Sequence, residues 1–154
     1  ASPIVMMSRH EDRQQMALQS GATAVVSERG EEGIAKVREA LGGGADAVLE
    51  CVGTEAAVEQ AFGVLHNGGR IGAVGVPHYQ NYQLGDTFFQ NIAFAGGSAS
   101  VTTYDKRLLL KEVLDGNINP GRVFTNTYDL DDVNQAYQDM QNRKSIKSML
   151  VVAD

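Results

Sequence analysis

The chain has 154 residues, a net charge of −6 at neutral pH and 43% apolar residues, which suits one domain that can bury its own core. The acidic balance argues against a nucleic-acid-binding protein, which normally presents a basic face. No apolar run approaches the roughly 18–20 residues that cross a membrane. Cys51 is the single cysteine, so no internal disulfide can form, and we expect a soluble, cytoplasmic protein.

Short runs of β-branched and apolar residues alternate with segments of helical period in the first two thirds of the sequence. The runs predict buried strands at residues 4–7, 24–26, 47–49, 70–74 and 92–95. Helices are predicted between them at residues 11–19, 31–41 and 55–65. Strands and helices that alternate at this spacing indicate right-handed crossovers and a parallel sheet with helices on both faces.

The third predicted helix has the clearest apolar face. Its members follow the spacing of one helical side: Val58, Ala61, Phe62 and Leu65. Thr54 is placed to cap this helix at its start, and the run Asn67-Gly68-Gly69 is placed to end it.

The alternation of predicted strands and helices changes after Gly97. The remaining sequence predicts a helix at 104–114, an extended segment at 122–128, a helix capped by Asp131, and a strand at 149–152. The expected buried stripe of the last helix is Val133, Ala136, Tyr137 and Met140. We therefore expect a partial dinucleotide-binding domain at residues 1–98 and an αβαβ tail at residues 99–154.

The start of the sequence lacks a phosphate-binding turn. The glycines at 42–44 follow a helix, and Gly69, Gly72 and Gly75 lie within or beside a strand. Neither group has the strand, glycine-rich turn and helix order that gives the dinucleotide fingerprint its meaning. The sequence thus predicts an α/β fold with an incomplete Rossmann-type parallel sheet that lacks its first βα unit.

Three stretches together resemble a known family. They are ADAVLECVG at 45–53, GGRIGAVGVP at 68–77 and SIKSMLV at 145–151. In this order and spacing they resemble the carboxyl-terminal, nucleotide-binding portion of the zinc-containing alcohol dehydrogenases of the medium-chain dehydrogenase/reductase superfamily. The resemblance runs from Ile4 to Val152.

The resemblance implies an oxidoreductase in which a separate amino-terminal catalytic domain holds zinc. The present sequence resembles the nucleotide-binding domain from its second strand onward, with the tail that packs on that catalytic domain. Catalytic zinc needs three protein ligands, whereas the cysteine and histidines here are scattered: Cys51, His10, His66 and His78. We therefore expect no metal site and no catalytic residue in this chain, and no activity from it alone.

The strand that the resemblance leaves out would lie centrally, between the strands at 4–7 and 47–49. We expect the sheet to close over the missing strand, to borrow a strand, or to belong to a longer polypeptide. The strand from Ile92 to Ala95 matches the edge by which family members pair across a two-fold axis, so a homodimer is expected.

The end of the first strand predicted here, which corresponds to the second strand of the complete domain, is the most informative position for the cofactor. Dinucleotide folds carry an acidic residue there, which binds the ribose hydroxyls of NAD and repels a 2′-phosphate. Here Ser8 takes that place and Arg9 follows, and a hydroxyl with a guanidinium suits a phosphate. The resemblance implies NADP(H) as cofactor, with Arg13 as a further contact, although NAD(H) or dual use stays possible.

Two features qualify this interpretation. Ser8 and Arg9 could simply cap the helix that begins near Glu11, although a cation at a helix amino terminus opposes the helix dipole. Glu28 stands where some NADP(H)-using members place a tyrosine beside the phosphate, and the neighbouring Arg29 could compensate.

The resemblance carries over further cofactor contacts at later strand ends. They are Cys51, Val52 and Gly53, then Val74, Gly75 and Val76, then Gly96, Gly97 and Ser98, and finally Lys147 at the pyrophosphate. At Gly75, Gly96 and Gly97, glycine lets the backbone approach a flat ligand closely. Core packing is the competing role for the valines, and we expect Cys51 to be a packed core residue rather than a nucleophile.

Three other functions remain open. One is a zinc-free, quinone-reductase-like member of the same superfamily, and another is a non-catalytic NADP(H)-binding module. The third is a methyltransferase, whose sheet is similar but which also places an acid after its second strand, so Ser8 and Arg9 argue against it. The substrate is not determined by this sequence.

Overall fold

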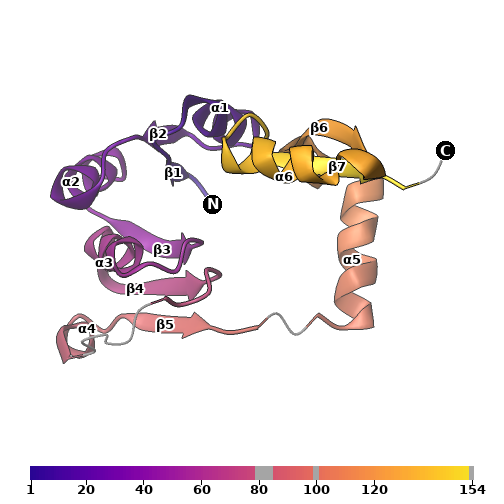
Figure 1. Cartoon of the computed structure of the whole chain (residues 1–154). Coiled ribbons are helices and arrows are strands. Elements are labelled where there is room, and N and C mark those ends of the chain that lie inside the picture. The colour runs from indigo at the N-terminus through magenta and orange to yellow at the C-terminus, as the bar shows by residue number, and fades with distance from the viewer. Residues whose placement is uncertain (79–84, 99–100, 153–154) are drawn as a thin grey trace. The chain divides into compact units, whose positions relative to one another are not determined.

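The computed structural model describes residues 1–78, 85–98 and 101–152. The chain divides into two compact units, Ala1–Ser98 and Ala99–Asp154, which are coloured in chain order in Figure 1. Each unit alternates helices with parallel strands. The α/β class expected from the sequence is therefore confirmed.

The first unit contains two parallel sheets. Strand β1 (Val5–Met7) pairs with β2 (Ala24–Val26). Strands β3 (Ala45–Glu50), β4 (Leu65–Ala73) and β5 (Ala93–Gly96) form a second sheet in that order and run in one direction (Figure 1). Among the described strands, β1 and β3 are not paired with each other. The option that the sheet closes directly from β1 to β3 is therefore wrong.

Helices connect these strands as right-handed crossovers require. They are α1 (Glu11–Gln19), α2 (Gly30–Ala40), α3 (Glu55–Gly63) and the short α4 (Gly85–Phe89). The cap predicted at Thr54 is confirmed, because its hydroxyl accepts a hydrogen bond from the Ala57 N–H at 3.3 Å. Helix α4 was not predicted, since five residues are too few to show a helical period.

Two clusters of buried side chains form the core of this unit. One comprises Ala45, Ala61, Leu65 and Ile71. The other comprises Val26, Val37 and Val64, with Val5, Met7 and Val48 packed against it. The second cluster includes side chains from β1, β2 and β3, so hydrophobic packing joins the two sheets although no hydrogen-bond ladder does.

The end of α3 differs from the sequence prediction. Leu65 is buried as expected, at 4% exposure, but it begins β4 and pairs with Ala45. Residues 66–69 form an irregularity before Arg70 pairs with Ala47. The Arg38 guanidinium donates to the Leu65 carbonyl at 2.6 Å and to the Gly63 carbonyl at 3.3 Å. Strand pairing and Arg38 satisfy backbone groups that a longer helix would have used, so the helix ends at Gly63.

The second unit has the predicted αβαβ order. It comprises α5 (Thr103–Leu114), β6 (Phe124–Asp129), α6 (Val133–Gln141) and β7 (Lys147–Val151), with β6 and β7 parallel. Short 3-10 helices cover Pro120–Val123 and Leu130–Asp132. A capping box between Thr102 and Asp105 begins α5.

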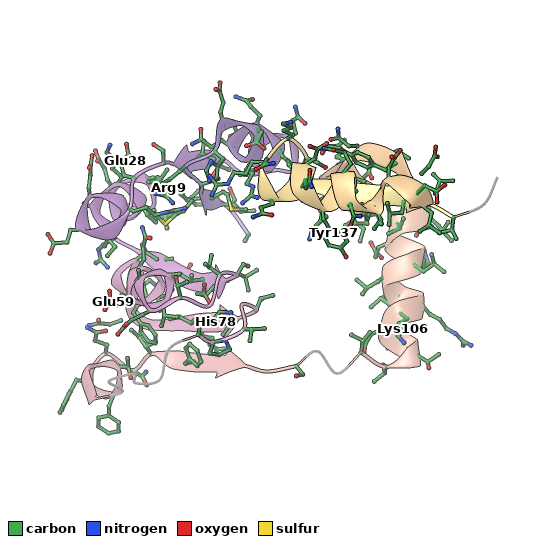
Figure 2. All side chains as sticks on the ribbon, in the orientation of Figure 1. Arg9, Glu28, Glu59, His78, Lys106 and Tyr137 are labelled. Carbon is green, nitrogen blue, oxygen red and sulfur yellow. The ribbon has the colours of Figure 1, made fainter. Side chains whose placement is uncertain are left out.

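Two expectations for α6 are wrong. Asp131 does not cap this helix, because it lies inside a 3-10 turn and the N-cap residue is Asp132, which makes no side-chain capping bond. Ala136 is buried at 2% exposure, whereas Tyr137 is 66% exposed and is labelled in Figure 2. The two strands that α6 packs on are too narrow to cover the whole apolar stripe.

None of the described helices is long and apolar enough to cross a lipid bilayer.

Candidate functional site

Ser8 lies at the exit of β1, that is, where the chain leaves the carboxyl end of the strand, and hydrogen bonds fix its position. The Ser8 N–H donates to the Val26 carbonyl of β2 at 3.0 Å, and the Gln14 side-chain amide donates to the Ser8 carbonyl at 2.6 Å. The Ser8 Oγ accepts from the His10 N–H at 3.3 Å. Ser8 is 8% exposed, and because Oγ acts as an acceptor in this bond, its own proton can still donate another hydrogen bond.

Arg9 follows Ser8 and is exposed. Its side chain, labelled in Figure 2, makes no hydrogen bond or ion pair with the described part of the chain. The N-cap of α1 is His10, and no side chain caps that helix. Ser8 and Arg9 therefore do not cap α1. Arg13 is also exposed, in the first turn of α1, so two arginines follow Ser8 closely along the chain.

Glu28 lies two residues beyond β2 and is labelled with Arg9 in Figure 2. The Lys36 ammonium lies 2.5 Å from the Glu28 carboxylate and 3.0 Å from that of Glu32. The hydrogen bond with Lys36 lowers the pKa of Glu28, and the bond with Glu28 raises the pKa of Lys36. Glu28, which stands where some members of the resembled family place a tyrosine, is thus paired with Lys36 of the same unit.

The exits of β3 and β4 are joined through Glu50, which the sequence did not single out. Glu50 is 5% exposed, and its carboxylate accepts from the N–H groups of Val52 at 2.7 Å and Gly53 at 2.9 Å. Its backbone carbonyl accepts from the N–H groups of Val74 at 2.7 Å and Gly75 at 3.0 Å. The alternation of a strand gives no signal for such a residue, because a glutamate at a strand end is ordinarily solvated.

Gly53 and Gly75 allow the two turns to touch. Gly53 has φ +83°, and a Cβ built on it would lie 1.9 Å from the Val76 carbonyl oxygen. A Cβ on Gly75 would lie 2.4 Å from the Gly53 nitrogen. The sequence predicted that Gly75 lets the backbone approach a ligand, but the neighbouring turn already occupies the space beside it. The first role of both glycines is contact between the two turns.

The apolar side chains on these turns are exposed. Val52, Val74 and Val76 have exposed fractions of 61%, 67% and 70%, so core packing does not account for them. Cys51 is exposed as well, and the expectation of a packed core cysteine is wrong. Partial burial of the sulfur, followed by the negative charge of Glu50, raises the pKa of the thiol. The raised pKa disfavours the thiolate, which is the nucleophilic form of cysteine.

The remaining predicted site residues lie at the next strand exit and in the second unit. Gly96 ends β5 and pairs with Ala73, where a Cβ would lie 2.7 Å from the Ala73 Cβ. Gly97 and Ser98 follow it and are exposed. The exits of β3, β4 and β5 therefore share one edge of a three-stranded sheet. Lys147 is exposed at the first position of β7, in the other unit.

A zinc ion does not fit the residues of this chain. In the described ranges no three or more His, Cys, Asp or Glu side chains gather closely enough to hold a metal. His66 instead pairs with Asp46, with 2.5 Å between Nε2 and Oδ1, and the His78 N–H donates to the Gly53 carbonyl at 2.8 Å.

Curated relatives resemble the chain over most of its length. It is 28% identical over 155 residues to an alcohol dehydrogenase from Cupriavidus necator, which covers 94% of the chain and 40% of the relative. It is 31% identical over 162 residues to an uncharacterized zinc-type alcohol dehydrogenase-like protein from Escherichia coli, covering 100% of the chain and 45% of the relative. The chain thus spans less than half the length of these relatives.

Solved structures give the same fold. The alcohol dehydrogenase TADH from Thermus sp. ATN1 matches with a TM-score of 0.89 and 28% identity, covering 99% of this chain and 45% of that chain. Benzyl alcohol dehydrogenase from Acinetobacter calcoaceticus has the same fold, with a TM-score of 0.87 and 24% identity over 99% of this chain and 43% of its own. A family model described as zinc-binding dehydrogenase matches residues 1–114. The chain belongs to the zinc-binding dehydrogenase family.

Proposed function

We propose that this chain is the NADP(H)-binding part of a zinc-dependent alcohol dehydrogenase, which transfers hydride between an alcohol and a nicotinamide cofactor. The exit of β1 carries the proposal. There the Ser8 Oγ is fixed by the His10 N–H at 3.3 Å, and the exposed Arg9 has no ion pair with the described residues. A guanidinium next in sequence to a hydroxyl suits the charge and the hydrogen-bond acceptors of a phosphate ester.

The other strand exits suit the rest of a dinucleotide. The exposed apolar surfaces of Val52, Val74 and Val76 provide a face against which flat rings pack. Gly96, Gly97 and Ser98 continue this edge. When bound, the cofactor supplies the carbon that accepts or donates hydride. The residues of this chain bind and orient it, and none of them is assigned a catalytic role.

The pairing of Glu28 with Lys36 supports the preference for NADP(H). An isolated carboxylate near the exits of β1 and β2 would repel a 2′-phosphate. Lys36 lies 2.5 Å from that carboxylate and 3.0 Å from that of Glu32, so its positive charge reduces, without cancelling, the repulsion that the Glu28 carboxylate would exert on a phosphate.

The complete enzyme would need further components. Because zinc does not fit the residues described in this chain, the metal and the proton relay would belong to a catalytic domain that partners it, and we expect the chain alone to be inactive. Strand β5 is an edge strand and is our candidate for pairing two copies into a dimer. The exposed free thiol of Cys51 is typical of the reducing cytoplasm, where we place the protein.

A titration of the chain with NADPH, NADH and S-adenosylmethionine tests the proposal. We expect the tightest binding for NADPH, and we expect Arg9→Ala to weaken NADPH by roughly tenfold or more, the scale of one charged hydrogen bond. The same variant should leave NADH affinity nearly unchanged. Arg107→Ala, which removes an exposed arginine of α5 in the other unit, is the matched control and should change neither affinity.

A preference for NADH, or an Arg9→Ala variant that binds NADPH as well as the unmodified chain does, contradicts the cofactor assignment. Binding of S-adenosylmethionine in preference to both dinucleotides contradicts the proposed function as a whole.

A further inference from the structure

Glu50 is a buried carboxylate that the proposed cofactor contacts do not use. It is the last residue of β3 and is 5% exposed. Its Oε1 accepts from the Val52 N–H at 2.7 Å and from the Gly53 N–H at 2.9 Å, and its Oε2 lies 3.1 Å from the same Gly53 nitrogen. No Lys, Arg or His of the described chain forms an ion pair with it. Backbone N–H groups alone compensate the burial of its charge.

The same residue also fixes the neighbouring strand exit. The Glu50 carbonyl accepts from the N–H groups of Val74 at 2.7 Å and Gly75 at 3.0 Å. The Gly53 carbonyl in turn accepts from the His78 N–H at 2.8 Å. Glu50 therefore binds the turn at residues 51–53 through its carboxylate and the exit at residues 74–76 through its backbone carbonyl.

The hydrogen bonds with Glu50 fix the backbone of residues whose apolar side chains are exposed. Val52 and Val74 each have a backbone N–H bound to Glu50, yet their side chains are 61% and 67% exposed. A residue whose backbone is fixed by hydrogen bonds while its apolar side chain is exposed is typical of a preorganised ligand-binding surface. If the turn were loose, ordering it on binding would reduce the affinity.

We propose that Glu50 is the positioning residue of the dinucleotide site, whose carboxylate holds the 51–53 turn against the 74–76 exit in the binding conformation. The inference rests on the proposed dinucleotide function but not on the preference for NADP(H). Glu50 acts through the turns and does not touch the extra phosphate, so its effect is common to NADPH and NADH.

Glu50→Gln tests this role, since it keeps the size of the side chain but replaces the charged acceptor of the Val52 and Gly53 N–H groups with a neutral amide, whose NH₂ group cannot accept from Gly53 as Oε2 does. We expect the NMR amide signals of Val52 and Gly53 to shift and their hydrogen exchange to accelerate. The affinities for NADPH and NADH should fall together, by roughly tenfold, the scale of one charge-assisted hydrogen bond. The ratio of the two affinities should not change. Arg9→Ala is expected to alter that ratio instead, so the two variants separate the two proposals.

Val37→Ala is the matched control for lost stability. Val37 is 4% exposed and belongs to the core cluster of α2, so this variant lowers the melting temperature without touching either turn. At a temperature where both variants are folded, it should leave both affinities unchanged. If Glu50→Gln also leaves the amide signals and affinities unchanged, or loses only as much affinity as Val37→Ala, Glu50 has no positioning role.

The remaining outcomes are equally decisive. If the chain prefers NADH but Glu50→Gln weakens both cofactors equally, the Glu50 inference stands and the NADP(H) preference fails. If the chain binds neither dinucleotide, both proposals fail. Should Glu50→Gln not fold, the unmodified chain serves as the test. Its Val52 and Gly53 amides must exchange slowly and must shift on addition of NADPH, and the absence of either result overturns the inference.

Discussion

Gly53→Ala tests the contact on which the two strand-exit turns depend. Gly53 has φ +83°, and a Cβ at this position would lie 1.9 Å from the Val76 carbonyl oxygen. Gly68 offers a matched control, because its φ is +85° and nothing lies within 4 Å of its Cβ position. The two substitutions therefore impose nearly the same backbone strain, and only the first creates a steric overlap.

The two contributions can be separated by magnitude. An alanine in the left-handed region costs roughly 1–2 kcal/mol, partly offset by about 0.4–1 kcal/mol from the reduced entropy of the unfolded chain. Gly68→Ala should thus lose about 1 kcal/mol of unfolding free energy. Gly53→Ala must also separate its turn from Val76, and overpacking of this kind costs roughly 1–3 kcal/mol more.

Urea unfolding measures the difference, provided that the slope of free energy against denaturant is unchanged. We expect Gly53→Ala to be less stable than Gly68→Ala by about 1–3 kcal/mol. We also expect Gly53→Ala, but not Gly68→Ala, to lose dinucleotide affinity. Equal stability of the two variants would refute the inferred contact between the turns.

Two further predictions concern the body of the first unit. The hydrogen bond with Asp46 raises the pKa of His66 from its ordinary value of 6.5. The stability from this pair is therefore complete below about pH 6.5 and is lost as the pH rises through the folded-state pKa. Melting curves of the unmodified chain and His66→Gln should differ at about pH 5.5 and converge once the pH exceeds the folded-state pKa of His66, and a difference that grows with pH would contradict this. Ile71→Ala, at a position 2% exposed, should cost about 2–5 kcal/mol in urea unfolding. Leu114→Ala, at a position 77% exposed, should cost under about 0.5 kcal/mol, and equal losses would contradict the assigned core.

Most of the fold followed from local patterns in the sequence. The strand at residues 24–26 was predicted with the bounds that β2 has, and the helix at 11–19 with those of α1. These elements are short, bounded by turn residues and built from one hydrophobic period, so local sequence is sufficient to define them. Leu65 was misassigned because its strand conformation depends on Ala45 and Arg38, which lie 20 and 27 positions away.

The candidate site likewise includes residues that local sequence points to and residues that depend on tertiary packing. Ser8 and Arg9 could be proposed from the sequence because a strand end is visible there and their chemistry is unusual at that position. Glu50 could not, since its burial and its bonds to Val52 and Gly53 depend on how the two turns pack. The exposure of Cys51 likewise depends on which side of the turn its side chain occupies.

The sequence alone therefore determined the parallel α/β class and the order of the strands and of the longer helices, and it showed that Ser8 and Arg9 follow the first strand. These properties depend on residues that are near neighbours along the chain. Only the tertiary structure decided that β1 and β3 belong to separate sheets, that Glu50 joins two strand exits and that Gly53 lies against Val76. Each of these depends on backbone groups brought together from distant segments, whose hydrogen bonds and close contacts no local pattern encodes.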